Sequence, residues 1–258
     1  HTIHTIRQYQ KTFVLLSDER MLAHGNEISY LPRNTLPPKE MYIYTIKKVI
    51  NALLDLPTYW RRSTHNRLIM TLLVKNEADI LEQNLLFHKH MGVDQFIITD
   101  NDSTDGTPQI IEKYVKKGWV AQYIHEPASG YEQKRWVDRM IWLAKKRYQA
   151  DWIINADADE FWFPSKGNLK TLLPSEHFGI LSAKVRNVCP EEGKPYWEWK
   201  NVALEVPNLE DYDLSPFSLF SRHYKKVMHR AAGYIQISMG NHKVTMLPHR
   251  EKAGDITI

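Results

Sequence analysis

The chain has 258 residues, of which 25% are charged and 43% belong to the hydrophobic set. This composition is typical of a globular protein and excludes a disordered chain, a collagen-like repeat and a small disulfide scaffold. Lys and Arg number 34 against 30 Asp and Glu, for a formal net charge of +4. This weak basicity permits contact with phosphate or anionic lipid, but it does not indicate a nucleic-acid-binding protein.

The cysteine content and the hydropathy of the chain indicate the cellular compartment in which we expect it. Cys189 is the only cysteine, so no internal disulfide can form, which suits a reducing compartment. No apolar run reaches 18 residues, so the sequence predicts no membrane-spanning helix. We therefore expect a cytoplasmic protein. The chain begins with His1, and we expect it to be part of a longer protein.

Residues 1–65 are predicted to form an N-terminal helical flank. Tyr42, Ile46, Ile50 and Leu53 recur at helical spacing and predict one apolar face. Arg61, Arg62 and Arg67 make a basic end. The helix either packs on the main domain or binds a partner or the inner face of a membrane. Under the membrane hypothesis, exchanging Arg61 and Arg62 for alanine would abolish liposome binding.

From residue 66 apolar runs of strand length alternate with helical patterns, which predicts βαβ units and a mostly parallel sheet. After about residue 178 the segments are short and strand-like. We therefore expect one α/β domain over 66–258, with a parallel half at 66–160 and a mixed half at 161–258. The expected strands are 67–74, 95–100, 119–124, 151–156, 180–186, 226–230, 234–238 and 243–247, and the expected helices are 77–91, 107–117 and 131–148.

Polar residues follow three of the predicted parallel strands. They are Lys75-Asn76-Glu77, the stretch 100–107 (DNDSTDGT) and 157–160 (DADE). Ligands of an open parallel sheet bind outside the carboxyl ends of its strands, so the sequence predicts one polar site there. The spacing of residues 100–107 does not match that of an EF-hand calcium-binding loop. We expect Ser103 and Asp105 to serve turn formation and helix capping, with Thr107 as the N-cap.

Asp157 and Asp159 are the sharpest candidates for metal binding. Residues i and i+2 of an extended segment point to the same side, so both carboxylates can share one Mn²⁺ or Mg²⁺ beside a diphosphate. The alternative is a solvated acidic turn, which the flanking apolar residues 161–163 disfavour. His242 is a possible further ligand or an ordinary loop histidine.

The remaining histidines and aromatic residues carry weaker signals. His229 and His249 are lesser metal candidates, and His88 and His90 are expected to be structural or exposed on their helix. The aromatic stretch 196–199 either stacks on sugar rings or packs in the core. The sequence lacks the glycine-rich motifs of P-loop NTPases and dinucleotide enzymes, and the G-x-S-x-G elbow of hydrolases.

Taken in order, these motifs resemble those of GT-A fold glycosyltransferases, specifically family 2-like bacterial enzymes. The shared features are a first strand ending in Asn76-Glu77, Asp100 within a D-x-S-x-D-G-T segment, a G-x-x-Q-x-x-W helix start with Tyr131, Gln133 and Trp136, and the D-x-D of Asp157 and Asp159 in a D-A-D-E-F form. The resemblance covers about residues 66–245 and makes 66–160 a nucleotide-binding half and 161–258 an acceptor half.

The resemblance implies a divalent metal and transfer of a sugar from a nucleotide-sugar, with a UDP-sugar favoured. The acceptor would be a hydroxyl of a glycan or lipid-linked molecule. Asn76, Glu77, Asp100 and Gln133 would contact the donor. Asp159 would bind metal, His242 would be a third ligand, and Asp157 would contact ribose or the metal's water shell.

The general base is identified from the same pattern. The family's base follows the D-x-D by several dozen residues, often in a Glu-Asp pair, which selects Asp211, with Glu191 and Glu192 as competitors. Two other functions stay open. One is a sugar-phosphate nucleotidylyltransferase, disfavoured because no glycine-rich loop follows the first strand. The other is a non-catalytic glycan-binding or scaffolding module, which would show no Mn²⁺-dependent donor hydrolysis.

Overall fold

The computed structural model describes residues 38–59, 66–127, 132–173, 178–189, 191–195, 198–202 and 225–258. The chain divides into two compact units, residues 1–47 and 48–258. In the first unit the described part is the start of helix α2 (Pro38–Leu54). Among the described residues, no helix is both long and apolar enough to cross a membrane.

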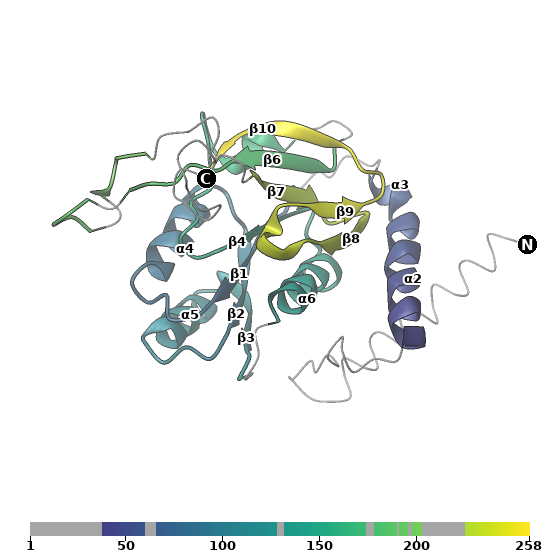
Figure 1. Ribbon diagram of the computed structural model, residues 1–258, viewed down its shortest axis with the longest axis horizontal. Helices are drawn as coiled ribbons and strands as arrows, with labels where there is room; N and C mark the ends of the chain where they lie inside the picture. Colours follow the sequence, from purple (N-terminus) through teal and green to yellow (C-terminus); the bar gives the residue numbers. More distant parts are fainter. Residues whose placement is uncertain are drawn as a thin grey trace, which may run out of the picture. The chain divides into compact units, whose positions relative to one another are not determined.

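The larger unit is built on a mixed sheet of eight strands in the order β3-β2-β1-β4-β7-β6-β10-β5 among the described residues (Figure 1). Strands β1 to β4 run parallel, β7 is antiparallel to both of its neighbours, and β10 is parallel to β6. The strands are β1 (Leu68–Val74), β2 (Gln95–Asp100), β3 (Val120–His125), β4 (Trp152–Ala156), β5 (Phe163–Pro164), β6 (Ile180–Lys184), β7 (Lys225–Arg230) and β10 (Glu251–Thr257).

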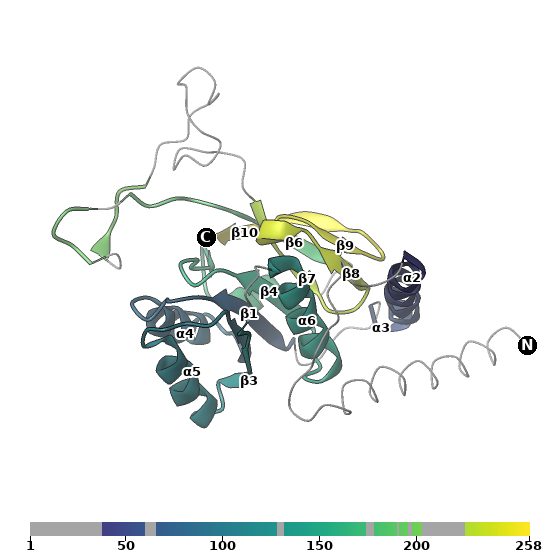
Figure 2. The same ribbon diagram turned by 60° about the horizontal axis from the view of Figure 1, so that its bottom comes forward.

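This arrangement confirms the predicted fold class. A parallel half is followed by a mixed half, and β8 (Tyr234–Ile237) pairs with β9 (Val244–Met246) in a separate hairpin. Right-handed βαβ connections place helices on both faces of the parallel strands. Helices α4 (Leu81–His90) and α5 (Thr107–Lys116) lie on one face, and α6 (Gln133–Lys146) lies on the other (Figures 1 and 2).

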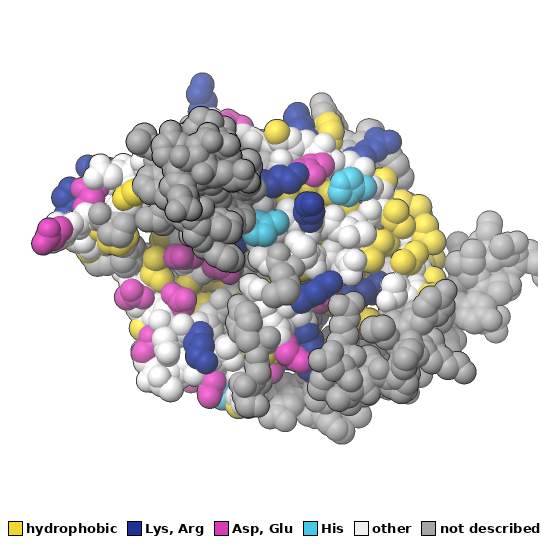
Figure 3. Space-filling model, viewed as in Figure 1, with side chains coloured by type: hydrophobic (Ala, Val, Ile, Leu, Met, Phe, Trp, Pro, Cys, Tyr) yellow, Lys and Arg dark blue, Asp and Glu magenta, His cyan; other side chains and the backbone are white. Residues whose placement is uncertain are grey.

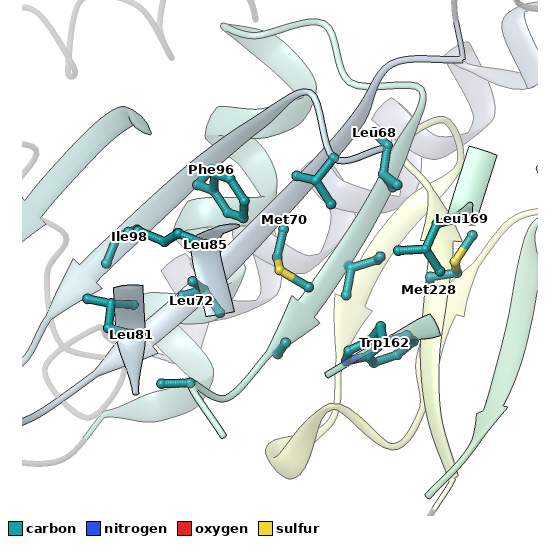
Figure 4. Packing of buried hydrophobic residues seen from close by; sticks show 14 of the residues in the cluster. Leu68, Met70, Leu72, Leu81, Leu85, Phe96, Ile98, Trp162, Leu169 and Met228 are labelled. Carbon is teal, nitrogen blue, oxygen red and sulfur yellow. The ribbon is translucent and has the colours of Figure 1, made fainter. Parts of the chain in front are cut away.

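Strand alternation divides the buried residues between the two faces. The even-numbered residues of β1 and β2 pack against α4 and α5, as Figure 4 shows for Met70, Leu72, Phe96 and Ile98 beside Leu81 and Leu85. The odd-numbered residues therefore point to the face that α6 covers. Both faces are apolar because helices cover the sheet on each side.

The start of α5 differs from the prediction by one residue. The helix begins at Thr107, with Gly106 in the cap position and Pro108 in the first turn. The Thr107 hydroxyl does not cap α5, because it accepts the backbone N–H of Glu77 at 2.8 Å. Asp105 instead accepts the N–H of Thr107 at 2.9 Å. The residue expected to cap the helix thus ties it to the loop after β1.

Polar side chains cross the interior on the α6 face. Thr71 donates to Asn155 at 2.5 Å, and the buried ring of His229 stacks on Tyr234 with centroids 5.1 Å apart. The Tyr234 hydroxyl donates to Asp138, which also accepts Lys48 Nζ at 2.7 Å. Residues 48–59 thus belong to the larger unit, although the sequence grouped them with the N-terminal flank.

Candidate active site

Three strand ends meet at the carboxyl edge of the parallel sheet, as predicted. The Asn76 backbone N–H donates to Ser103 Oγ at 2.8 Å, and the Asn76 side-chain oxygen accepts the Thr104 N–H at 2.8 Å. Asn76 adopts a positive φ of 56°, a conformation that asparagine tolerates better than most residues. Asp105 also accepts the Ala78 N–H at 3.0 Å. The loops after β1 and β2 are therefore locked together by their polar side chains.

Asp100 is fully buried at the end of β2. One oxygen accepts the backbone N–H of Ser103 at 3.0 Å and its hydroxyl at 2.5 Å. The other accepts the Tyr123 hydroxyl at 3.1 Å, and burial together with the Asp100 charge raises the pKa of Tyr123. Both oxygens already accept hydrogen bonds within the chain, because Ser103 and Tyr123 close around the carboxylate. The predicted contact of Asp100 with a nucleotide stays a prediction.

The acidic loop after β4 forms around a buried lysine that the sequence did not single out. Lys226 of β7 places Nζ 3.2 Å from Asp157 Oδ2 and 2.6 Å from Glu160 Oε1. Burial raises the pKa of Glu160 to about 7, against the opposing effect of Lys226. The pairing of β7 beside β4 explains this contact, and sequence reasoning missed it because 69 residues separate Asp157 from Lys226.

Glu77 shows that carboxylates of different loops share one region. Its pKa is raised to about 7, first by burial and then by the charges of Asp159, Asp79 and Asp157. Burial and the charge of Asp157 also raise the pKa of Asp159. Like charges that approach in a partly desolvated site disfavour ionisation. Figure 3 shows acidic side chains gathered on this face, over the region of α4 and β1.

Helix α4 holds the acidic loop from behind. Asn84 Nδ2 donates to the carbonyls of Ala158 and Glu160 at 2.8 and 2.9 Å. His88 Nε2 accepts the Trp162 N–H at 3.0 Å, which leaves the proton on Nδ1 to be donated to Asn84. Burial lowers the pKa of His88 to about 3, so the ring is neutral. The expectation of a structural His88 is confirmed, and His90 is exposed.

The other predicted ligands lie apart or outside the described residues. His242 Nδ1 is 2.9 Å from the Lys225 carbonyl, and a side chain at Gly240 would meet His242 Nε2 at 2.6 Å. Among the described residues, no group of three His, Cys, Asp or Glu side chains could hold a metal ion. The structure therefore does not unite His242 with Asp157 and Asp159 as one ligand set, and its metal role stays a prediction.

Gln133 is the first residue of α6, at the same edge of the sheet. His229, the residue before the last of β7, is fully buried, and burial lowers its pKa to about 4, so it serves the core. Several predicted residues lie outside the described residues: Arg61, Arg62, Tyr131, Tyr196, Trp197 and Asp211.

The segment of the chain that forms this edge of the sheet is similar to a known protein family. Residues 71–197 match the family model described as Glycosyl transferase family 2. Just under half of the chain is therefore similar to glycosyltransferases of family 2. The matched segment contains the ends of β1, β2 and β4, and therefore Glu77, Asp100, Asp157 and Asp159.

Curated relatives are also glycosyltransferases. A lipopolysaccharide core biosynthesis glycosyltransferase, LpsC of Rhizobium meliloti, is 27% identical over 58% of this chain and 46% of its own. A family 92 glycosyltransferase of Oryza sativa is 24% identical over 54% of this chain and 24% of its own. The matches thus span less than half the length of either relative. Among solved structures, TarS of S. aureus aligns with a TM-score of 0.40 at 17% identity, over 64% of this chain and 47% of that one.

Proposed function

We propose that this chain is a metal-dependent glycosyltransferase that moves a sugar from a nucleotide-sugar, with a UDP-sugar favoured, to a hydroxyl of a glycan or lipid-linked acceptor. The observation that carries the proposal is the convergence of Glu77, Asp157 and Asp159 at the carboxyl edge of a parallel sheet, where burial and the charges of the two aspartates raise the pKa of Glu77. Nucleotides bind at this edge in open α/β sheets.

The residues at this edge fit a divalent cation. The charge of Asp157 contributes to the raised pKa of both Glu77 and Asp159, and a bound 2+ charge would relieve this repulsion. Mg²⁺ is usually held by one or two carboxylates together with substrate phosphates, so a third protein ligand is not required. Asp157 and Asp159 supply that pair, and Asp159 is the main candidate because Lys226 already engages Asp157. A bound Mn²⁺ or Mg²⁺ would neutralise charge on the departing diphosphate.

The chain's own residues prepare the site. Lys226 fixes Asp157 and Glu160, and its ammonium offsets part of the negative charge that a diphosphate would meet. Asp100, already oriented by Ser103 and Tyr123, keeps further lone pairs for a contact with the nucleotide. Asn76 and Gln133 lie at the same edge and are proposed donor contacts. The loops are therefore ordered before the donor binds.

An inverting transfer also needs a carboxylate to take the proton of the acceptor hydroxyl. Asp211 is proposed for this role, and it lies outside the described residues. Similarity to LpsC, a lipopolysaccharide core biosynthesis glycosyltransferase, supports a cell-envelope glycan as acceptor. The D-A-D-E-F form of residues 157–161 is the basis for proposing a bacterial type of enzyme. We accordingly propose that the enzyme acts on the cytoplasmic side of a membrane and makes peripheral contact with the lipid that carries the acceptor.

Loss of one carboxylate tests the proposal. Asp159→Asn should lower Mn²⁺-dependent hydrolysis of a nucleotide-sugar at least about 100-fold, since one electrostatic contact to a transition state is worth that much. The loop should stay folded, because Asn84 and His88 hold it through other residues. Asp255→Asn, on the exposed strand β10, is the matched control and should keep full activity. Undiminished metal-dependent hydrolysis in Asp159→Asn would overturn the metal assignment.

A further inference from the structure

The buried ammonium of Lys226 lies closer to Glu160 than to Asp157. Its Nζ is 2.6 Å from Glu160 Oε1 and 3.2 Å from Asp157 Oδ2, and the residue is 6% exposed. A charge buried this deeply persists only beside an opposite charge that offsets its desolvation. The shorter contact makes Glu160 the main counter-ion of this lysine.

Glu160 faces the interior of the protein, whereas Asp157 faces outward. The two side chains are 13% and 43% exposed. The second oxygen of Glu160, Oε2, accepts the backbone N–H of Asp157 at 3.3 Å and the indole N–H of Trp162 at 3.4 Å. Contacts within the chain therefore hold both oxygens of Glu160, and Asp157 is the one of these two carboxylates that a ligand can reach.

Strand β7 fixes the place of the ammonium. Met228 of β7 pairs with Ile154 of β4, and the two strands lie side by side in the sheet (Figure 1). Lys226 lies two residues before Met228, so it projects from the same face of the strand. The acidic loop follows β4 directly. The ammonium is therefore held at the end of the sheet, and the loop must accommodate its charge there.

The position of Lys226 opposes the proposed cation. Its charge also acts on Asp159, because it partly lowers the pKa that burial and Asp157 raise. An ammonium that stabilises these carboxylates repels a divalent cation at the same place. A unit charge a few ångströms away changes the affinity for such an ion by about tenfold or more. Glu160 removes this conflict, because it forms a neutral pair with Lys226 beneath the loop.

We propose that Glu160 is a positioning residue for the cation: it offsets the charge of Lys226 and so leaves the two aspartates of the loop available to Mn²⁺ or Mg²⁺. The inference rests on the proposed function, and it adds a residue that acts on the metal without touching it. Lys226 in turn anchors the loop to the sheet. Without Glu160, the ammonium would have only Asp157 as its partner and would compete with the cation for it.

The test measures metal affinity of the whole chain without turnover. MnCl₂ is titrated in a thermal-shift assay at a fixed concentration of the best-binding of UDP, GDP, CDP and ADP, at about pH 8, where carboxylates are ionised. The midpoint is the MnCl₂ concentration that gives half of the full shift. Glu160→Gln keeps the shape of the side chain and removes its charge, so it should raise the midpoint at least about tenfold.

Glu251→Gln is the matched control for the loss of charge. It removes the partner of Lys225, which lies next to Lys226 on the same strand but is exposed. Water and salt screen an exposed pair, so the midpoint should stay within about twofold of the wild-type value.

The double variant Lys226→Gln, Glu160→Gln separates charge from structure. It removes both members of the ion pair, so the midpoint should return to within about threefold of the wild-type value. If Glu160 served only the structure of the loop, the second substitution would not rescue metal affinity. Lys226→Gln alone gives an independent reading if Glu160→Gln does not fold, and its midpoint should be no higher than that of the wild type.

The outcomes distinguish this inference from the proposed function. No shift of the wild type with MnCl₂ and any of the four nucleotides would overturn the proposed function itself. A wild-type shift with an unchanged midpoint in Glu160→Gln, or a double variant with a midpoint as high as that of Glu160→Gln, would overturn this inference alone. A midpoint raised by Lys226→Gln would do the same.

Discussion

At the scale of single residues, the side chains of the site differ in how far hydrogen bonds and ion pairs within the chain already hold them. Asp100 and Asn76 are held by hydrogen bonds of the strand-end loops, whereas Glu77 and Asp159 lie in a field of like charge. Lys226 is the buried cation in this field and holds two carboxylates at once. Removing one member of a buried ion pair leaves an unpaired charge, which is more costly than removing both.

The buried pair of Lys48 and Asp138 shows the same asymmetry away from the site. The two side chains are 8% and 11% exposed, and the Tyr234 hydroxyl also donates to Asp138. Lys48→Met should destabilise the fold by about 3–5 kcal/mol, because it leaves Asp138 buried without its cation. Urea unfolding measures this difference. The double variant Lys48→Met, Asp138→Leu should recover a large part of it, and a double variant less stable than Lys48→Met would contradict the assignment.

At the scale of elements, α4 is the support of the acidic loop. Its Asn84 and His88, one turn apart, bind the backbone of residues 158–162 across 74 residues or more of sequence. The tautomer of His88 is set by the Trp162 N–H, so only the neutral ring fits. The loop's position therefore depends on one uncharged imidazole.

Removal of the Asn84 amide should loosen the loop. Asn84→Ala leaves the carbonyls of Ala158 and Glu160 without their donor and should cost about 1–3 kcal/mol in urea unfolding. Gln83→Leu is the neighbouring control, since Gln83 Oε1 has no partner among the described residues. Equal stability of Asn84→Ala and wild type would refute the supporting role of α4.

The state of His88 predicts how stability changes with pH. Its folded pKa of about 3 lies below the ordinary 6.5, so the unfolded chain binds more protons between these values. Stability contributed by the neutral ring is present above about pH 6.5 and is lost as the pH falls. From pH 7 to pH 5 the wild type should lose about 2 kcal/mol more than His88→Gln. Urea unfolding at both pH values checks this, with the exposed His90→Gln expected to follow the wild type.

At the scale of the whole molecule, the fold and its polar edge follow from the sequence, and the site's interior does not. Alternating apolar runs predicted the parallel strands, and the polar residues after them predicted where Asn76, Asp100 and Asp157 meet. The sequence did not predict the contacts between segments that lie far apart in the chain. Lys226 reaches Asp157 because β7 inserts beside β4, and Glu126 reaches Arg139 because α6 packs under β2.

The error at Thr107 has the same origin. Thr107 was assigned as a helix cap from its local pattern, but its hydroxyl accepts the backbone N–H of Glu77, a tertiary neighbour. Helix and strand types depend on short-range periodicity, which a sequence displays directly. Side-chain partners depend on packing between elements, which a single sequence does not display.

The most direct test of the central claim is a thermal-shift measurement of the whole chain with UDP, GDP, CDP and ADP, each with and without MnCl₂. A ligand that binds only the native state adds about 2.7 kcal/mol of stability at a hundredfold excess over its Kd. We expect a rise in melting temperature that needs both a nucleoside diphosphate and Mn²⁺. No rise with any nucleotide in the presence of Mn²⁺ would contradict a metal-dependent donor site at the ends of β1, β2 and β4.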